Sequence, residues 1–458
     1  MNKRQCIIAF LSMMSISLTG KEVLNREALT LLLNDSNPYI FTAIADQLIQ
    51  EKRIIYAKGE FDTKLGAKYE EKQYPKSTSH FNDLYVEKPM ENGMEWLAGY
   101  RQADGTQEYN NIKTSSDGEV RVGLKIPINS LLQGSNQRQL NLSLATLNSL
   151  QATSSTQKNL RELYFSIFAS YYRLLVQQEL MVLEKELLKN AQQRYAFIKS
   201  QVELGDLPQI SLVESKQIIV DREQRMAESN NAYMIAKQQL LTYLNVSEEL
   251  LDQNFEIPRL KELEFKAVTF EAAYAKMVKN RPELEILRVE ADKIKQERQF
   301  ASLMKYPQFD AAVYGVHDLQ YDNGVKFSLE MAFPMEQRKY EGKSSEMQLK
   351  KEKNEYEIKK ELLEAERIIT NAVKSLNTLQ QNYKSVVDEV DLAQQVERAE
   401  QRKFEIGQSE LFMLNARELR TLQVKQKKLE YTFRICLNVL EIEKETGEMK
   451  IPAYTRKE

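Results

Sequence analysis

Two stretches of the chain alternate apolar and polar residues in the manner of a strand. In residues 119–128 every second residue is aliphatic, and in residues 325–334 every second residue is aliphatic or aromatic. This period of two predicts strands with one apolar and one polar face. We predict that the apolar face carries Val120, Val122, Leu124, Ile126, Val325, Phe327, Leu329 and Met331, and that the polar face carries Arg121, Lys125, Lys326 and Glu330.

Each strand leads into a long stretch in which apolar residues recur every third or fourth position. Leu163, Ile167, Tyr171 and Leu174 are an example. This spacing predicts amphipathic helices that pack as coiled-coil-like pairs. A helix from Leu131 to about residue 200 would be about 100 Å long at 1.5 Å per residue, which is far longer than a globular domain needs.

The pattern of the first half of the chain returns in the second half. Residues 202–205 (VELG) match residues 404–407 (FEIG), and residues 36–40 (SNPYI) correspond to residues 280–284 (NRPEL). We therefore predict a duplicated unit of about 200 residues, in the order helix, β-hairpin and long helical hairpin. The predicted divisions are a signal peptide at 1–20, a first repeat at 21–248 with strands near 63–71 and 119–128, a linker at 249–264, a second repeat at 265–446 with strands near 308–316 and 325–334, and a tail at 447–458.

The N-terminus has the features of a secretory signal. Lys3 and Arg4 precede a short apolar stretch at 6–14, and small residues follow at 15–17. This order suits a signal peptidase, although a short buried N-terminal helix is the alternative. No other segment has the roughly 20 consecutive apolar residues of a membrane-spanning helix. Cleavage would leave Cys436 as the single thiol, so we expect no disulfide within the chain.

Four predicted strands are too few to form a closed sheet. Unpaired strand edges are not tolerated inside a bilayer, so strands that cross a membrane must be pooled between chains. Four strands per chain would give twelve in a trimer, which is within the range of membrane barrels. The alternative is an ordinary half-buried sheet packed on the helices. Residues 72–118 are polar and predicted to be a long loop, but an extra strand at 94–100 stays open, because Trp96, Ala98 and Tyr100 share one face.

Composition gives little support to catalysis or to nucleic-acid binding. The chain has 2 histidines, 2 cysteines and a net charge of −2. No catalytic, zinc-ligand or phosphate-loop pattern is present in the sequence. We therefore predict no enzyme activity, no cofactor and no metal site, and no nucleic-acid partner. The 15 methionines are scattered and suit helix packing as well as copper binding.

These landmarks together resemble the TolC family of outer-membrane efflux proteins over essentially the whole chain after the signal. The most specific is the stretch from Gly407 to Glu418 (GQSELFMLNARE), which is similar to the second helical tip turn of one branch of that family. The stretch from Gly205 to Ile210 (GDLPQI), with Glu214, resembles the first tip turn. The remaining landmarks are Asn37 and Pro38, Phe61 and Asp62, Pro127, residues 280–284, residues 307–309 and Pro334.

The resemblance implies a fold that is mainly α with membrane β: a trimeric 12-stranded β-barrel in the outer membrane joined to a periplasmic α-helical barrel. It implies the exit duct of a tripartite efflux or type I secretion system, with a periplasmic adaptor and an inner-membrane pump or ABC transporter as partners. The adaptor-docking tip turns would be Leu204, Gly205, Asp206, Ile406, Gly407 and Gln408. The chain departs from some members after the second tip, where residues 413–416 (MLNA) lack the acidic residues that narrow the tunnel entrance. The alternative is a periplasmic coiled-coil scaffold or adaptor without a barrel.

Overall fold

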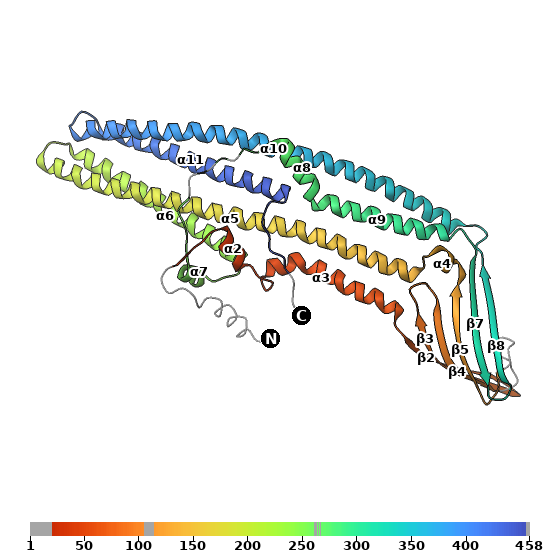
Figure 1. Ribbon diagram of the computed structural model, residues 1–458. Coiled ribbons are helices and arrows are strands. Elements are labelled where there is room, and N and C mark those ends of the chain that lie inside the picture. The colour runs from red at the N-terminus through yellow and green to blue at the C-terminus, as the bar shows by residue number, and fades with distance from the viewer. Residues whose placement is uncertain (1–20, 105–113, 261–262, 264, 266, 455–458) are drawn as a thin grey trace. The chain divides into compact units, whose positions relative to one another are not determined.

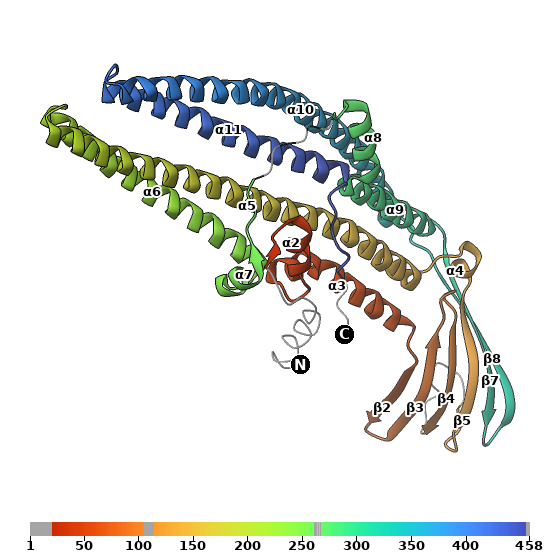
Figure 2. The ribbon, with the colours of Figure 1, turned by 60° about the vertical axis from the view of Figure 1, so that its left-hand side comes forward.

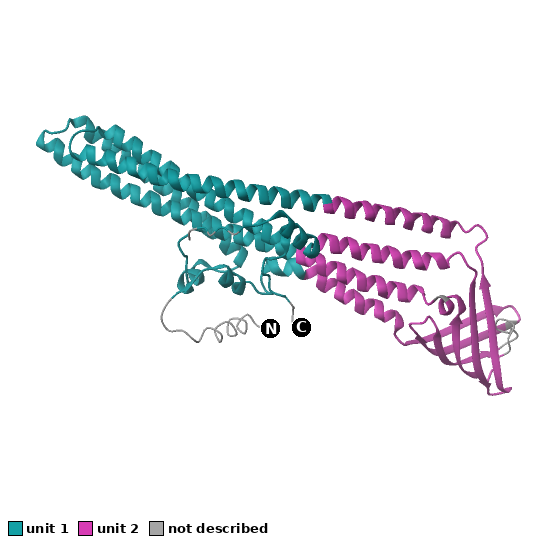
Figure 3. Ribbon diagram, turned by 45° about the horizontal axis from the view of Figure 1, so that its top comes forward, with its two compact units in different colours: residues 1–44, 159–281, 363–458 teal, residues 45–158, 282–362 magenta. Residues whose placement is uncertain are grey.

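The computed structural model describes residues 21–104, 114–260, 263, 265 and 267–454. The predicted signal peptide and residues 455–458 of the predicted tail lie outside the described residues. The chain divides into two compact units, which are coloured separately in Figure 3. The helical unit comprises residues 1–44, 159–281 and 363–458, and the sheet unit comprises residues 45–158 and 282–362. Each unit takes segments from both predicted repeats.

The helical unit is built from helices and one short parallel strand pair. Its elements are β1 (Glu22–Val23), α2 (Arg26–Leu32), the start of α3 (Pro38–Lys58), the second part of α5 (Gln137–Leu204), α6 (Gln209–Leu244), α7 (Glu248–Asn254), β6 (Phe255–Glu256), α8 (Phe270–Asn280), the second part of α10 (Arg338–Glu405) and α11 (Leu411–Thr446). Side-chain oxygens cap the first N–H groups of α2 and α7: Asn25 accepts from Ala28 at 2.8 Å, and Ser247 accepts from Leu250 at 3.3 Å.

The long helices run in pairs (Figure 1), and apolar side chains pack between them. On α5, Ile167, Tyr171 and Leu174 of the predicted stripe are buried. The seam between α10 and α11 is formed by Ala372, Leu376, Leu379, Tyr383, Ile435 and Ile442. The spacing of three and four residues on α10 is that of a coiled-coil core. Both long helices, α5 and α10, have 68 residues, and both return helices, α6 and α11, have 36.

The sheet unit contains a single antiparallel sheet of six strands (Figure 2). Its strands are β2 (Lys64–Tyr74), β3 (Ser77–Pro89), β4 (Glu95–Asp104), β5 (Glu119–Pro127), β7 (Gln308–Asp318) and β8 (Asp322–Ala332), in the spatial order β2-β3-β4-β5-β7-β8. The unit also holds η1 (Gly59–Phe61), α4 (Ile128–Gln133), α9 (Pro282–Leu303), the second part of α3 and the first parts of α5 and α10.

The antiparallel sheet has six strands, two more than the four predicted. β3 and β4 occupy the segment predicted to be a long loop, and they separate β2 from β5, which were predicted to be hairpin neighbours. β4 covers the stretch at 94–100 that was left open. β3 has a weak alternating pattern, because Asn82 lies on the apolar face and Phe81 on the polar one. β3 is stabilised by hydrogen-bonded pairing with all of β2, and the local sequence of β3 does not reveal this pairing.

Within the described part of the chain, no helix combines the length and the apolar character needed to cross a bilayer.

Candidate functional site

The six-stranded sheet exposes large apolar side chains on one face and buries charged side chains at the centre of its polar face. Val122, Phe327 and Val325 are 53%, 66% and 77% exposed, whereas Arg101 and Glu119 on the other face are 3% and 4% exposed. In a water-soluble sheet the apolar face would pack on the core and the polar face would be wet. The sheet is curved (Figure 3), and ion pairs join charged side chains on its polar side. This arrangement suits a sheet whose outer face contacts hydrocarbon.

The apolar face continues across all six strands in register. Trp96 on β4 lies opposite Leu124 on β5, Leu124 lies opposite Val313 on β7, and Val313 lies opposite Phe327 on β8. The exposed large apolar residues of this face are Leu65, Tyr69, Leu84, Val86, Trp96, Tyr100, Val120, Val122, Val313, Val325, Phe327, Leu329 and Met331. A continuous apolar area of this kind marks a membrane or protein contact.

The polar face is held by ion pairs between strands. Arg101 on β4 donates to Glu119 on β5 at 2.7 Å, with both side chains at most 5% exposed. Arg121 on β5 reaches across β4 to Asp83 on β3 at 2.6 Å. A buried charge is costly unless a partner lies in contact, and here each of these guanidinium groups has one. The sequence reasoning missed Asp83, Arg101 and Glu119, although charges alternate there with Leu84, Val86, Trp96 and Tyr100.

Glycines on the polar face make room for tyrosine rings. A Cβ at Gly66 would lie 2.4 Å from the ring of Tyr85, and a Cβ at Gly99 would lie 2.8 Å from the Cβ of Tyr85. A Cβ at Gly123 would lie 2.2 Å from the ring of Tyr314. Side chains at these positions would force the strands apart, so the glycines allow the rings to lie flat over the sheet.

The structure places the predicted strand residues on the expected faces. Cross-strand pairing puts Val120, Val122, Leu124 and Ile126 on the same face as Val325, Phe327, Leu329 and Met331, and puts Arg121, Lys125, Lys326 and Glu330 on the opposite face. Their contacts with lipid or with a lumen remain a proposal. Lys125 and Arg138 both approach the carboxylate of Glu95, at 3.7 and 2.6 Å.

The predicted tip turns are tight reversals between long helices. α5 ends at Leu204 and α6 begins at Gln209, while α10 ends at Glu405 and α11 begins at Leu411. Gly205 and Gly407 have φ of 84° and 73°, in the left-handed region that favours glycine. Each is followed by a residue whose N–H bonds five residues back: Asp206 to the carbonyl of Gln201 at 2.9 Å, and Gln408 to that of Lys403 at 2.8 Å.

The tips present exposed apolar side chains beside these turns. Leu204 and Ile406 are 71% and 67% exposed, and Ile210 and Phe412, the second residues of the return helices, are 58% and 72% exposed. The two turns thus offer matching apolar surfaces, one from each helical hairpin. Apolar residues on an exposed turn are typical of a protein-docking surface.

Buried polar contacts link the two hairpins within the helical unit. Arg194 on α5 pairs with Glu418 on α11 and donates to Asn415 at 2.7 Å. Glu184 on α5 lies 3.7 Å from Arg222 on α6, and both side chains are 7% exposed. Burial raises the pKa of Glu184, although the attraction of Arg222 opposes the shift. The contacts of Arg194 with Glu418 and Asn415 therefore join the two hairpins, whereas the Glu184–Arg222 pair joins the two helices of the first hairpin.

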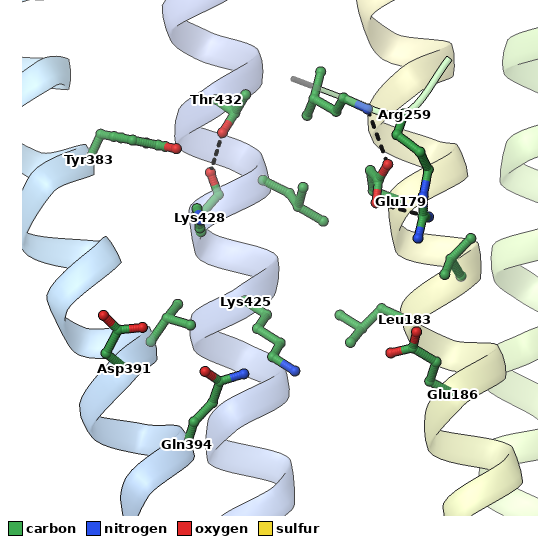
Figure 4. Close-up of a pocket in the computed structure, with 14 residues that line it drawn as sticks. Glu179, Leu183, Glu186, Arg259, Tyr383, Asp391, Gln394, Lys425, Lys428 and Thr432 are labelled. Carbon is green, nitrogen blue, oxygen red and sulfur yellow. Dashed lines mark hydrogen bonds and ion pairs between the residues drawn. The ribbon is translucent and has the colours of Figure 1, made fainter. Parts of the chain in front are cut away.

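A groove of about 470 Å³ lies between α5, α10 and α11 in the same unit (Figure 4). Glu179 on one wall pairs with Arg259 at 3.1 Å and accepts the N–H of Leu260. Lys425 on α11 and Asp391 on α10 lie on the other wall, so the groove carries both signs of charge. The predicted linker at 249–264 therefore lies against α5 through Arg259 and Leu260. Such a mixed polar lining suits contact with a protein surface better than a small apolar ligand.

No protein-family model matches the chain, and no curated protein matches its sequence. Solved structures do match. The outer membrane protein VceC from Vibrio cholerae aligns with a TM-score of 0.69 and 13% identity, covering 92% of this chain and 96% of that one. The open MtrE outer membrane channel of Neisseria gonorrhoeae aligns with a TM-score of 0.69 and 11% identity, covering 94% and 93%. The CmeC outer membrane channel of Campylobacter jejuni aligns with a TM-score of 0.67 and 10% identity, covering 95% and 90%.

At these identities the likeness establishes the fold. The chain has the fold of these outer-membrane proteins, which confirms the expected mainly helical fold with an antiparallel sheet. The sheet has six strands where four were expected, and the trimer and the closed barrels stay predictions.

Proposed function

We propose that this chain is the outer-membrane exit duct of a tripartite efflux or type I secretion system. Three copies would form a passive conduit, with the strands in the outer membrane and the helices in the periplasm. The partners would be a periplasmic adaptor and an inner-membrane pump or ABC transporter. The fold shared with outer-membrane channels supports the proposal, and the resemblance noted in the sequence supplies these partners.

The single observation that carries the proposal is the reversed burial of the sheet. A sheet with exposed valine, leucine and phenylalanine on one face and buried ion pairs on the other is unstable in water. Hydrocarbon favours the first face, while a wet lumen solvates the remaining charges of the second. A water-soluble scaffold gains nothing from that arrangement. Its exposed apolar area would promote aggregation instead.

The tips supply the adaptor contact in this proposal. Leu204 and Ile406, beside Gly205 and Gly407, would enter apolar depressions on the adaptor, and Asp206 and Gln408 would supply polar contacts at the rim. Because the two turns have the same backbone geometry, one adaptor structure could recognise both. The absence of acidic residues at 413–416 in the sequence argues against an acidic closing ring at that level.

Membrane fractionation with conductance measurement tests the proposed function. The chain should stay with the outer membrane through a high-salt wash, dissolve in detergent, yield three cross-linked copies and conduct ions in planar bilayers. A periplasmic scaffold or adaptor would wash off in salt and show no conductance, and that result would refute the proposal. The single described cysteine, Cys436, is buried, which raises its pKa to about 11, so engineered surface cysteines can be cross-linked without interference.

A further inference from the structure

We propose that β3 and β4 are membrane-spanning strands of the barrel wall, so that three copies of the chain close a barrel of eighteen strands instead of twelve. This rests on the proposed function, which supplies the bilayer and the trimer. The new element of the proposal is that each copy contributes all six strands of its sheet to the barrel wall. The resemblance to the TolC family implies four strands per copy, so the added hairpin changes the dimensions of the pore.

The two added strands are paired along most of their length with the strands on either side. All 11 residues of β2 pair with β3, and β4 pairs with β5 from Glu95 to Arg101. β2 and β5 therefore have no direct ladder within the sheet. A hairpin that lay outside a narrower barrel would leave β2 and β5 paired with each other, which the observed order excludes.

Side chains on the polar face tie the added hairpin to both neighbours. The ion pair of Asp83 with Arg121 joins β3 to β5, and that of Arg101 with Glu119 joins β4 to β5. On the other side, the ring of Tyr85 on β3 occupies the space above Gly66 of β2. Strands held at both borders by buried charges and by a ring over glycine are integral to the sheet.

The outer face of the hairpin has the character expected of a lipid contact. Leu84 and Val86 on β3 are 53% and 42% exposed, and Trp96 and Tyr100 on β4 are 49% and 38% exposed. They continue the rows of exposed apolar residues on β5, β7 and β8. The continuity places β3 and β4 at the same membrane depth as the strands that the sequence predicted.

The two ends of the sheet suit each other as partners between copies. β2 and β8 both have 11 residues, and an antiparallel sheet of six strands brings β8 of one copy antiparallel to β2 of the next. Matching apolar faces restricts the register to steps of two residues. In the registers that place Glu330 of β8 opposite Lys64 or Lys68 of β2, Lys326 lies opposite Lys68 or Lys72, so charge pairing does not select between them. Six strands alone are fewer than the eight of the smallest membrane barrels.

A barrel of eighteen strands has a wider lumen than one of twelve, and it would therefore admit larger cargo. Barrel diameter grows roughly linearly with strand number, so eighteen strands give a diameter about one and a half times that of twelve. Barrels of about this size hold an open aqueous channel. At the outer-membrane level the duct would therefore admit bulkier solutes than a twelve-stranded wall allows.

The single tryptophan of the chain reports directly on the added hairpin, because Trp96 lies on the outer face of β4. The full chain is reconstituted into vesicles of phosphatidylcholine with brominated acyl chains, and its fluorescence is compared with that in unbrominated vesicles. We expect the brominated acyl chains to quench the fluorescence of Trp96, and aqueous iodide to have no effect on it. In the matched control Trp96→Phe with Leu97→Trp, the indole moves to the polar face, and the pattern should reverse.

The number of copies is measured on the same detergent-solubilised protein by light scattering. Three copies, with Trp96 quenched by lipid, support eighteen strands. A conducting trimer in which iodide alone quenches Trp96 overturns the inference and leaves the proposed function intact. Two copies would give a twelve-stranded wall and also overturn it. A chain that neither inserts nor conducts refutes the proposed function itself.

Discussion

Replacing Phe327 with arginine should prevent assembly in the membrane. Phe327 is at the middle of β8 and 66% exposed on the apolar face of the isolated chain. In water, an arginine at so exposed a position would cost almost nothing, because little packing is lost. In a bilayer the same arginine would lie near the midplane of the hydrocarbon. The substitution therefore separates a sheet in lipid from a sheet in water.

The expected cost follows from the number of copies. A cation at the lipid-facing midplane of a membrane barrel costs roughly 2–4 kcal/mol. Three copies each carry the change, so the trimer would lose roughly 6–12 kcal/mol. That is comparable with the whole stability of an ordinary protein. We expect the yield of heat-resistant trimer, measured by gel electrophoresis of detergent extracts, to fall to near zero.

The neighbouring residue provides the matched control. Ser328 lies opposite Ala312 on the polar face, so Ser328→Arg adds the same charge one residue away, where the proposed lumen is wet. Trimer yield should be close to that of the wild type, while ion selectivity in planar bilayers shifts toward anions. Equal trimer yields for Phe327→Arg and Ser328→Arg would refute the assignment of the apolar face to lipid.

Two further predictions concern the helical hairpins. Gly407→Val should weaken adaptor docking and export, because the positive φ costs a β-branched residue about 1–3 kcal/mol. The control Gly342→Ala, inside α10, should be neutral or slightly stabilising. Export equal to that of the wild type for Gly407→Val would contradict the tip assignment. Because burial raises the pKa of Glu184 above its ordinary value of 4.5, its carboxyl destabilises the fold increasingly as the pH rises above that value. The melting temperature of the wild type minus that of Glu184→Gln should therefore fall as the pH is raised from about 4.5, and a rise would contradict the assignment.

The sequence predicts those parts of the fold in which a local pattern repeats. The helix breaks at Gly205 and Gly407 and the strands β5 and β8 follow directly from local periodicity and from glycine conformation. The strand β3 was missed because its polar residues follow the composition of a loop. Its conformation depends on hydrogen bonds with β2 and on the contact of Asp83 with Arg121, which lies 38 residues away.

For the candidate site, too, the sequence predicted local features and missed the contacts between distant residues. The two faces of β5 and β8 could be read from alternation, since side chains in a strand must alternate. The partner of each charge could not, because it depends on strand order. Placing Arg101 against Glu119 requires β4 next to β5, and the sequence left that order open. The inter-hairpin pair of Arg194 with Glu418 likewise depends on which helices pack together.

The reversed burial of the sheet also constrains the order in which the molecule can be made. A single copy in water would expose the whole apolar face of six strands and two open edges, so its sheet cannot be a stable intermediate there. The helical unit buries its own seams and has no such restriction. We therefore expect helix formation to precede strand closure, and closure to coincide with membrane entry and joining of the copies. Any delay at that step favours aggregation over assembly, because the apolar face and the strand edges stay exposed in the meantime.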